Sequence, residues 1–250
     1  MRVVLVLLLT VAACSLPPPA PDPPAPGAPD DVRVVVREDT TSPRVALALE
    51  ADVGCAEPDR AALDLAWAWL AGPPAARSRL GEDVRVRVLG TLGAQSDAVD
   101  AERVRYTASV HVAGATVART HFVVRLLRYR LHTLLRDGVP DDGLDAARAA
   151  LRAAPGLCRG AAYAAAADTL GHAAVRRALS AHLGDGAGRL GPHRVWIRAP
   201  QAGAIRQALV AGPPARVRYA ERLPGEVYVE DRAIGTFPLG LNADDVVVAR

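Results

Sequence analysis

The chain has 250 residues, half of them hydrophobic, and a formal net charge of +3 at pH 7. Its length suits one domain with a small appendage. All 30 basic residues are arginines scattered along the sequence, and only two Phe, five Tyr and three Trp are present. Because nucleic-acid binding needs clustered basic residues and stacking aromatics, we do not expect a nucleic-acid partner.

The first thirteen residues predict an export signal. Arg2 precedes an apolar run over residues 3–11 that is too short to span a bilayer. The sequence Val-Ala-Ala-Cys at residues 11–14 resembles the lipobox of bacterial lipoproteins, where cleavage leaves a lipid-bearing cysteine at the new N-terminus. We therefore expect Cys14 to anchor the chain in the bacterial cell envelope, on the periplasmic side of the outer membrane rather than at the inner membrane. An ordinary signal with an incidental cysteine is the alternative.

A proline-rich linker follows the lipidated cysteine. Residues 15–31 read SLPPPAPDPPAPGAPDD, a composition that cannot pack a core and favours extended polyproline II. Residues 14–31 are therefore expected to hold the folded part away from the membrane surface.

Strands and helices alternate over residues 32–212. Alternating apolar and polar residues predict strands over 32–37, 44–52, 84–89, 104–112 and 194–198. Helical apolar spacing, capping residues and Ala-rich runs predict helices over 60–70, 117–136, 143–154, 160–183 and 201–210. Asp59 can cap the first of these helices. Strands followed by a run of helices favour an α+β fold, a mostly antiparallel sheet with helices on one face.

Two cysteines remain in the folded part. In an oxidising envelope Cys55 and Cys158 can form a disulfide, but the sequence cannot show whether their Cα atoms come close enough. Of the two alternatives, a disulfide or two isolated buried thiols, we expect the second.

Three segments resemble the half-domain of the M16 metallopeptidases, the family of insulinase and the mitochondrial processing peptidase. Residues 34–43 are similar to the family's opening hairpin. Residues 45–58 resemble its second strand and the Gly-Ser-x-x-Glu turn after it, with Gly54 and Glu57 in the turn. Residues 92–98 and 106–110 look like the Gly-Gly-x-x-Asn-Ala segment and the Tyr-rich strand that follows. The order and spacing of these segments imply the half-domain fold over residues 32–212.

The resemblance also implies that the zinc site is lost. In active members the helix after the second strand carries His-x-x-Glu-His, whose two His bind zinc while the Glu activates water. Here Leu65 and Trp69 stand in place of the two His, and Ala68 replaces the Glu. We therefore expect no catalytic residues, no metal and no cofactor. Asp64, the acid of this helix, is expected to face solvent or the helix start.

The remaining candidates predict no other chemistry. The six histidines are scattered, and none are spaced four residues apart as two ligands on one helix would be: His111, His121, His132, His172, His182 and His193. No Gly-x-Ser-x-Gly elbow is present. Trp67 and Trp69 either pack in the core or line a peptide-binding surface at the former metal site.

Residues 216–250 differ in character from the preceding domain. Short apolar strands alternate with Gly-Pro turns there, which predicts a small β unit. Residues 227–241 resemble PEGA-type repeats, with Gly-Thr-Phe-Pro at residues 235–238 near the family's turn pattern. The alternative is an extra hairpin that finishes the main sheet.

Two functions fit these features. The first is a membrane-anchored, inactive M16-like protein that acts as a non-catalytic partner or a scaffold for peptides or proteins. Because the family's peptidases enclose a chamber with several half-domains, this hypothesis implies self-association or pairing with an active M16-type homologue. The alternative is a structural or ligand-binding envelope lipoprotein with no link to proteolysis.

Overall fold

The structure is a computed structural model that describes residues 32–71, 79–84, 88, 90–112, 114–153, 158, 160–211, 234, 239 and 241–249. The predicted signal peptide, Cys14 and the proline-rich linker lie outside these residues. Within the described part of the chain, no helix has the length and apolarity needed to cross a membrane.

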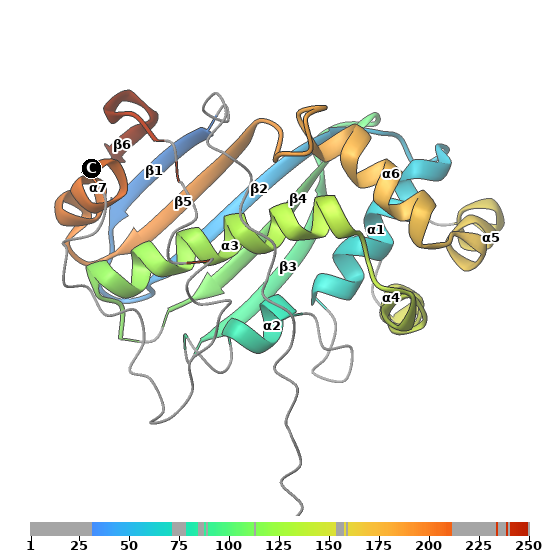
Figure 1. Ribbon diagram of the computed structural model, residues 1–250, viewed down its shortest axis with the longest axis horizontal. Helices are drawn as coiled ribbons and strands as arrows, with labels where there is room; N and C mark the ends of the chain where they lie inside the picture. The colour runs from blue at the N-terminus through green and yellow to red at the C-terminus, as the bar shows by residue number, and fades with distance from the viewer. Residues whose placement is uncertain are drawn as a thin grey trace, which may run out of the picture.

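Six strands form one sheet (Figure 1). They are β1 (Val32–Glu38), β2 (Arg44–Asp52), β3 (Thr91–Ala98), β4 (Arg103–His111), β5 (His193–Ala199) and β6 (Val246–Ala249), in the order β3-β4-β2-β5-β1-β6. β1 runs parallel to β5 and β6, and the other neighbouring pairs are antiparallel. The sheet is therefore mixed, with antiparallel pairing in its β3-β4-β2-β5 part.

The described helices are α1 (Pro58–Ala71), α2 (Arg79–Asp83), α3 (Val117–Asp137), α4 (Asp141–Ala153), α5 (Ala161–Thr169), α6 (His172–Leu183) and α7 (Ala202–Ala211). α3 and α6 lie across β2, and α7 packs on β1 and β6 (Figure 1). A short 3-10 turn, η3 (Ala243–Asp245), leads into β6. This arrangement confirms the predicted α+β fold with helices packed on one face of the sheet.

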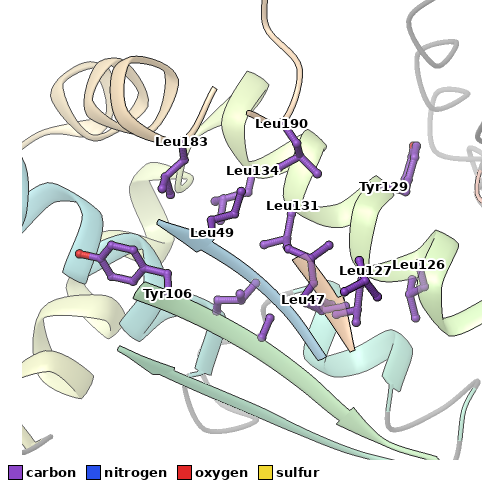
Figure 2. Close-up of a cluster of buried hydrophobic side chains, with 14 of the residues drawn as sticks. Leu47, Leu49, Tyr106, Leu126, Leu127, Tyr129, Leu131, Leu134, Leu183 and Leu190 are labelled. Atoms are coloured by element: carbon purple, nitrogen blue, oxygen red, sulfur yellow. The ribbon is translucent and has the colours of Figure 1, made fainter. Parts of the chain in front are cut away.

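The long helix α3 is well specified by its sequence. The Thr116 hydroxyl accepts a hydrogen bond from the backbone N–H of Arg119 and caps the helix start. Gly138 ends the helix with a φ of +71°, a conformation that glycine adopts without a Cβ clash. Between these ends, its leucines face the apolar side chains of β2, including Leu47 and Leu49 (Figure 2). This contact forms the centre of the core.

One predicted strand is wrong. Val84 and Val88 are helical and fully buried, and the strand of this region is β3, paired with β4 over Thr91–Ala98. Residues 85–87 and 89 lie outside the described residues. Val84 and Val88 are four residues apart, so they share a face in a helix as well as in a strand. The alternating pattern therefore did not distinguish the two structures.

The predicted helix over 160–183 is two helices, α5 and α6. The break is at Leu170 and Gly171, both of which have extended backbone angles. The Leu170 N–H still bonds to the Ala166 carbonyl and closes α5. Glycine is unfavourable in the interior of a helix, and this accounts for the position of the break.

The described part of the C-terminal segment joins the main sheet. β6 pairs in parallel with β1, with Val246 opposite Val34. Ile234, Leu239 and Leu241 belong to the same core cluster as the helices and the sheet. Residues 216–233 and the PEGA-like turn at 235–238 lie outside the described residues.

Candidate functional site

Helix α1 is the helix on which the sequence resemblance predicts the zinc positions of active M16 peptidases. It starts at Pro58, and Glu57 just before it accepts a hydrogen bond from the Gly54 N–H at 2.7 Å. Asp59 lies in the first turn, where it bonds to the His182 ring at 3.0 Å across to α6. No capping bond from Asp59 is seen in the described residues; its carboxylate instead links two helices.

The three residues predicted to stand at the zinc positions, Leu65, Ala68 and Trp69, carry no metal-binding atom. Leu65 is fully buried in the core, and Ala68 is half-buried. The half-buried Trp69 packs against α4 at Gly143, where a Cβ would lie 2.6 Å from the indole Nε1. A side chain at position 143 would therefore displace the Trp69 ring. Apolar packing occupies this face of α1 where a zinc site would need imidazole and carboxylate groups.

The neighbouring Trp67 has a different role. Its ring is buried, stacks at a tilt on Tyr106 with centroids 5.1 Å apart, and donates from Nε1 to the Thr107 carbonyl. Of the two tryptophans considered as candidates, Trp67 is a core residue and Trp69 reaches a surface pocket.

A pocket of about 600 Å³ lies beside Trp69. Its apolar lining comes from α1, α2 and α3 and includes Trp69, Leu70, Leu80 and Leu134. Its polar lining comes mainly from α3, α4 and the start of α6 and includes Arg130, Thr133, Asp137, Asp142 and His172. An apolar wall with a few polar groups is the usual composition of a ligand site.

The polar groups at this pocket are held by neighbouring atoms. Arg130 forms a buried ion pair with Asp83 at 2.7 Å. The His172 ring Nδ1 lies 2.7 Å from the Val139 carbonyl oxygen. A carbonyl oxygen can only accept a hydrogen bond, so Nδ1 is the ring nitrogen that carries the proton and donates it. Asp142 is exposed at the start of α4. The pocket thus has a fixed polar wall and a carboxylate open to solvent.

Asp64 is not where the sequence placed it. It is 6% exposed and accepts hydrogen bonds from Arg60 Nε at 3.1 Å, the Tyr106 hydroxyl at 2.6 Å and the Tyr163 hydroxyl at 2.7 Å. Its partners come from α1, β4 and α5, which lie far apart in the sequence. The prediction was wrong because the charge of Asp64 is satisfied by residues that no local pattern links to it.

In this Asp64 cluster, the two tyrosine hydroxyls keep their protons. Burial, with the charge of Asp64 adding to it, raises the pKa of the Tyr106 and Tyr163 hydroxyls far above their ordinary value. Both tyrosines therefore stay protonated and donate to the carboxylate. The cluster stabilises the packing of α1 and α5 and is unsuited to proton transfer near neutral pH.

Cys55 and Cys158 form a disulfide with a Cα–Cα distance of 5.4 Å. The expectation of two isolated thiols is therefore wrong. The bond joins the segment before α1 to the segment before α5, the helix that carries Tyr163. The disulfide and the Asp64 cluster hold the same two helices together, although Cys55 and Cys158 are 103 residues apart.

The histidines do not form a cluster. His111 is exposed at the end of β4, while His121 and His132 are buried along α3 and His193 is buried on β5. Burial lowers the pKa of His121 to about 4 and that of His193 to about 3, with Arg125 and Arg128 respectively adding repulsion. Across the described residues, no three His, Cys, Asp or Glu side chains form a group that could hold a metal ion.

Comparisons with known proteins find likeness in structure alone. No protein-family model and no curated protein matches the sequence. The solved structure of an M16 peptidase inactive domain from Pseudomonas fluorescens is similar, with a TM-score of 0.51 and 18% identity, over 70% of this chain and 45% of that one. A conserved protein from Enterococcus faecalis has a TM-score of 0.51 and 12% identity, over 71% of this chain and 44% of that one.

These likenesses show the fold, which is that of an M16 peptidase half-domain. The chain spans less than half the length of either structure that it matches.

Proposed function

We propose that this chain is a lipid-anchored, catalytically inactive M16-like protein of the bacterial cell envelope that binds a peptide or protein segment at the Trp69 pocket. The observation that carries the proposal is the set of side chains on α1 and the pocket beside them. The sequence resemblance assigns Leu65, Ala68 and Trp69 to the former zinc positions, and a ligand-sized pocket opens beside Trp69.

Loss of catalysis follows from side-chain chemistry. Zinc in the family's motif needs two imidazole nitrogens, and the bound water needs a carboxylate base. Leu65, Ala68 and Trp69 supply none of these atoms, and Asp64, the carboxylate next to them, is held by Arg60 and two tyrosine hydroxyls. The role that we propose for this surface is therefore ligand binding.

The pocket suits an apolar side chain of an extended peptide. Trp69, Leu70 and Leu134 offer apolar contacts, and a rigid aromatic ring is the kind of group that anchors protein contacts. Asp142 on the rim adds negative charge, whereas the charge of Asp137 is offset by its ion pair with Arg136. A peptide with an apolar residue next to a basic one is therefore the best match.

The proposed partner is an active M16-type homologue or a second copy of this chain. Family peptidases enclose their substrate between several half-domains, and this chain provides one. The proposal is supported by the extent of the likeness, since the fold of this chain corresponds to 45% of the M16 inactive domain from Pseudomonas fluorescens.

One experiment tests inactivity and binding together. The chain from Ser15 onward, which keeps every described residue, is assayed for zinc content, for cleavage of casein and for binding of fluorescein-labelled casein peptides. We expect no zinc, no cleavage, and peptide binding that Trp69→Ala weakens by roughly 30-fold, the effect of losing about 2 kcal/mol at an anchor residue.

The matched control is Leu92→Ala, because Leu92 is a half-buried apolar side chain of β3 that takes no part in the pocket. Stoichiometric zinc or chelator-sensitive cleavage contradicts the proposed inactivity. Peptide binding that is absent, or equally weakened by both variants, contradicts the proposed pocket.

Anchoring is tested separately in the full-length chain. We expect the protein to fractionate with membranes and Cys14→Ser to release it or leave its signal uncleaved. Incorporation of labelled fatty acid that is unchanged by Cys14→Ser contradicts the lipid anchor.

A further inference from the structure

The face of the sheet turned away from the helices, here called the open face, carries a row of arginines. In the sheet register Arg37 lies opposite Arg198, Arg198 opposite Arg44, and Arg44 opposite His111. All four side chains are exposed. Neighbouring strands are about 4.8 Å apart, so this row concentrates three positive charges within about 10 Å.

A second basic row lies four residues back along the strands. Arg33 is opposite Arg194, and both are exposed. Between the two basic rows lies an apolar row of half-buried side chains, in which Val35 is opposite Trp196 and Trp196 is opposite Ala46. The open face therefore presents five arginines around a strip that contains an exposed edge of tryptophan.

These charges are not neutralised within the described part of the chain. None of the five arginines forms an ion pair there, and Arg44 donates only to the Ser109 hydroxyl at 2.7 Å. The carboxylate of Asp39, in the turn after β1, accepts hydrogen bonds from Thr41 and Ser42. Its electrostatic contact with Arg198 offsets part of one charge.

The acids of the open face lie at its other end. Glu50 forms an ion pair with Arg105 at 2.7 Å, and Asp52 is opposite Arg103 at the end of β2. The open face is therefore polarised, with a basic end at Arg37, Arg198 and Arg44 and an opposite end where the carboxylates of Glu50 and Asp52 are matched by arginines of β4. A binding partner with negative charge is oriented by this polarity.

We propose that the basic end of the open face binds the anionic phospholipid surface of the membrane. Arginine is suited to phosphate because its planar fork donates two parallel hydrogen bonds. Tryptophan favours the interface between headgroups and acyl chains, where its ring is apolar and its N–H meets polar groups. The open face combines both kinds of side chain on one face of the sheet.

The tether makes this contact reachable, and in this respect the inference rests on the lipid anchor of the proposed function. Ser15 to Asp31 is a proline-rich stretch of 17 residues, and a chain of that length in polyproline II would span roughly 50 Å at about 3.1 Å per residue. This stretch precedes β1, the strand that carries Arg33 and Arg37. An anchored domain meets the bilayer at a high effective concentration, so even a weak electrostatic contact is populated.

Other occupants fit less well. A second copy that docks by the same face brings five arginines against five arginines, and like charges across an interface are repulsive. An acidic protein surface has the required charge, but nothing fixes its distance from the domain, whereas the anchor fixes that of the membrane.

The test uses the unlipidated chain from Ser15 onward, so that it does not depend on lipidation. Flotation with vesicles of phosphatidylglycerol and phosphatidylethanolamine is compared with flotation with phosphatidylcholine alone. We expect binding to the anionic vesicles, weakening at high salt. Replacing Arg37, Arg44 and Arg198 with Gln should reduce it on the order of a hundredfold, at about 1 kcal/mol per arginine.

The matched control replaces three exposed arginines of the helices, Arg152, Arg176 and Arg177, with Gln. It changes the net charge equally and should leave most of the binding. Trp196→Ala should weaken binding as well, by roughly tenfold for the loss of an interfacial anchor of about 1.4 kcal/mol.

Three outcomes overturn the proposal. One is absence of binding to anionic vesicles, and another is equal loss in the control and open-face variants, which would reduce the effect to net charge. The third is failure to bind vesicles together with binding of a poly-glutamate peptide that the open-face variant loses, which would assign the face to an acidic protein. Because peptide binding and lipidation are measured separately, each of these is distinguishable from failure of the proposed function.

Discussion

The two faces of the sheet differ in the burial and pairing of their charged side chains. On the helix side, Asp64 and Arg60 are buried together, as are Asp83 and Arg130. On the open face, Arg37 and its neighbours in the basic row are exposed and form no ion pair within the described residues. Buried charges need matched partners to be tolerated, so they serve folding, whereas exposed charges without partners contribute little to folding and are available for binding.

The largest expected effect is on the helix side. Asp64→Ala leaves Arg60 buried without its carboxylate and removes the acceptor of two tyrosine hydroxyls, so we expect a loss of about 3–5 kcal/mol of unfolding free energy. Urea denaturation measures it. The matched control is Asp145→Ala, since that side chain is 92% exposed, and it should stay within about 0.5 kcal/mol of the wild type. Similar losses in both variants would mean that the Asp64 cluster contributes nothing special.

Next in size is the disulfide between Cys55 and Cys158. Replacing both with Ser should destabilise the chain by about 2–4 kcal/mol, because the bond restricts the unfolded chain. Thermal unfolding with and without reductant measures this effect. Reductant should lower the Tm of the wild type and leave the double variant unchanged; an unchanged wild-type Tm would contradict a formed bond.

A smaller effect is expected from mild acid, between pH 7 and pH 5.5. Buried His121 and His193 have pKa values of about 4 and about 3, against an ordinary value of 6.5. Below pH 6.5 the unfolded chain binds protons that the folded state excludes. Stability should therefore fall as pH falls, by up to about 1.4 kcal/mol per pH unit for each histidine, and level off below those values.

Urea titrations at pH 7 and pH 5.5 measure this slope. His193→Gln should remove one histidine's share, whereas His111→Gln should leave the slope unchanged, because His111 is exposed. A slope equal in all three proteins would show that other groups cause it.

The smallest effect is expected on the open face. Replacing Arg37, Arg44 and Arg198 with Gln should change the unfolding free energy by less than about 0.5 kcal/mol for each exposed side chain. The same urea assay used for Asp64→Ala measures it. A loss as large as that of Asp64→Ala would break the comparison between the faces, since it would make the arginine row part of the folded core.

The sequence predicted most of the fold, because the long elements have a clear apolar period. α3, β2 and β4 follow their patterns to within a few residues. The strand predicted over residues 84–89 was wrong because Val84 and Val88 share a face in a helix as well as in a strand. The strand β3 was missed because Leu92 to Ala98 has little β-branched or aromatic character. Such a segment becomes a strand by pairing with β4.

The candidate site was predictable only in part. Identity alone was enough to exclude zinc ligands at Leu65, Ala68 and Trp69. The partners of Asp64 were not predictable, because Tyr106 and Tyr163 lie 42 and 99 residues away. The same holds for the Cys55–Cys158 bond and for the open face, where Arg37, Arg198 and Arg44 become neighbours only through strand register. Contacts of this kind depend on topology, which local spacing does not encode.

The position of β1 has a consequence for the order in which the chain can fold. Its two neighbours in the sheet, β5 and β6, both come from the last quarter of the sequence. A strand that is released first from a ribosome or an export channel must therefore wait for residues 193–249 before it can pair. Such long-range pairing slows folding, because the whole intervening chain has to be closed into a loop. β1 accordingly joins the sheet after β2, β3 and β4 have become available to pair with one another.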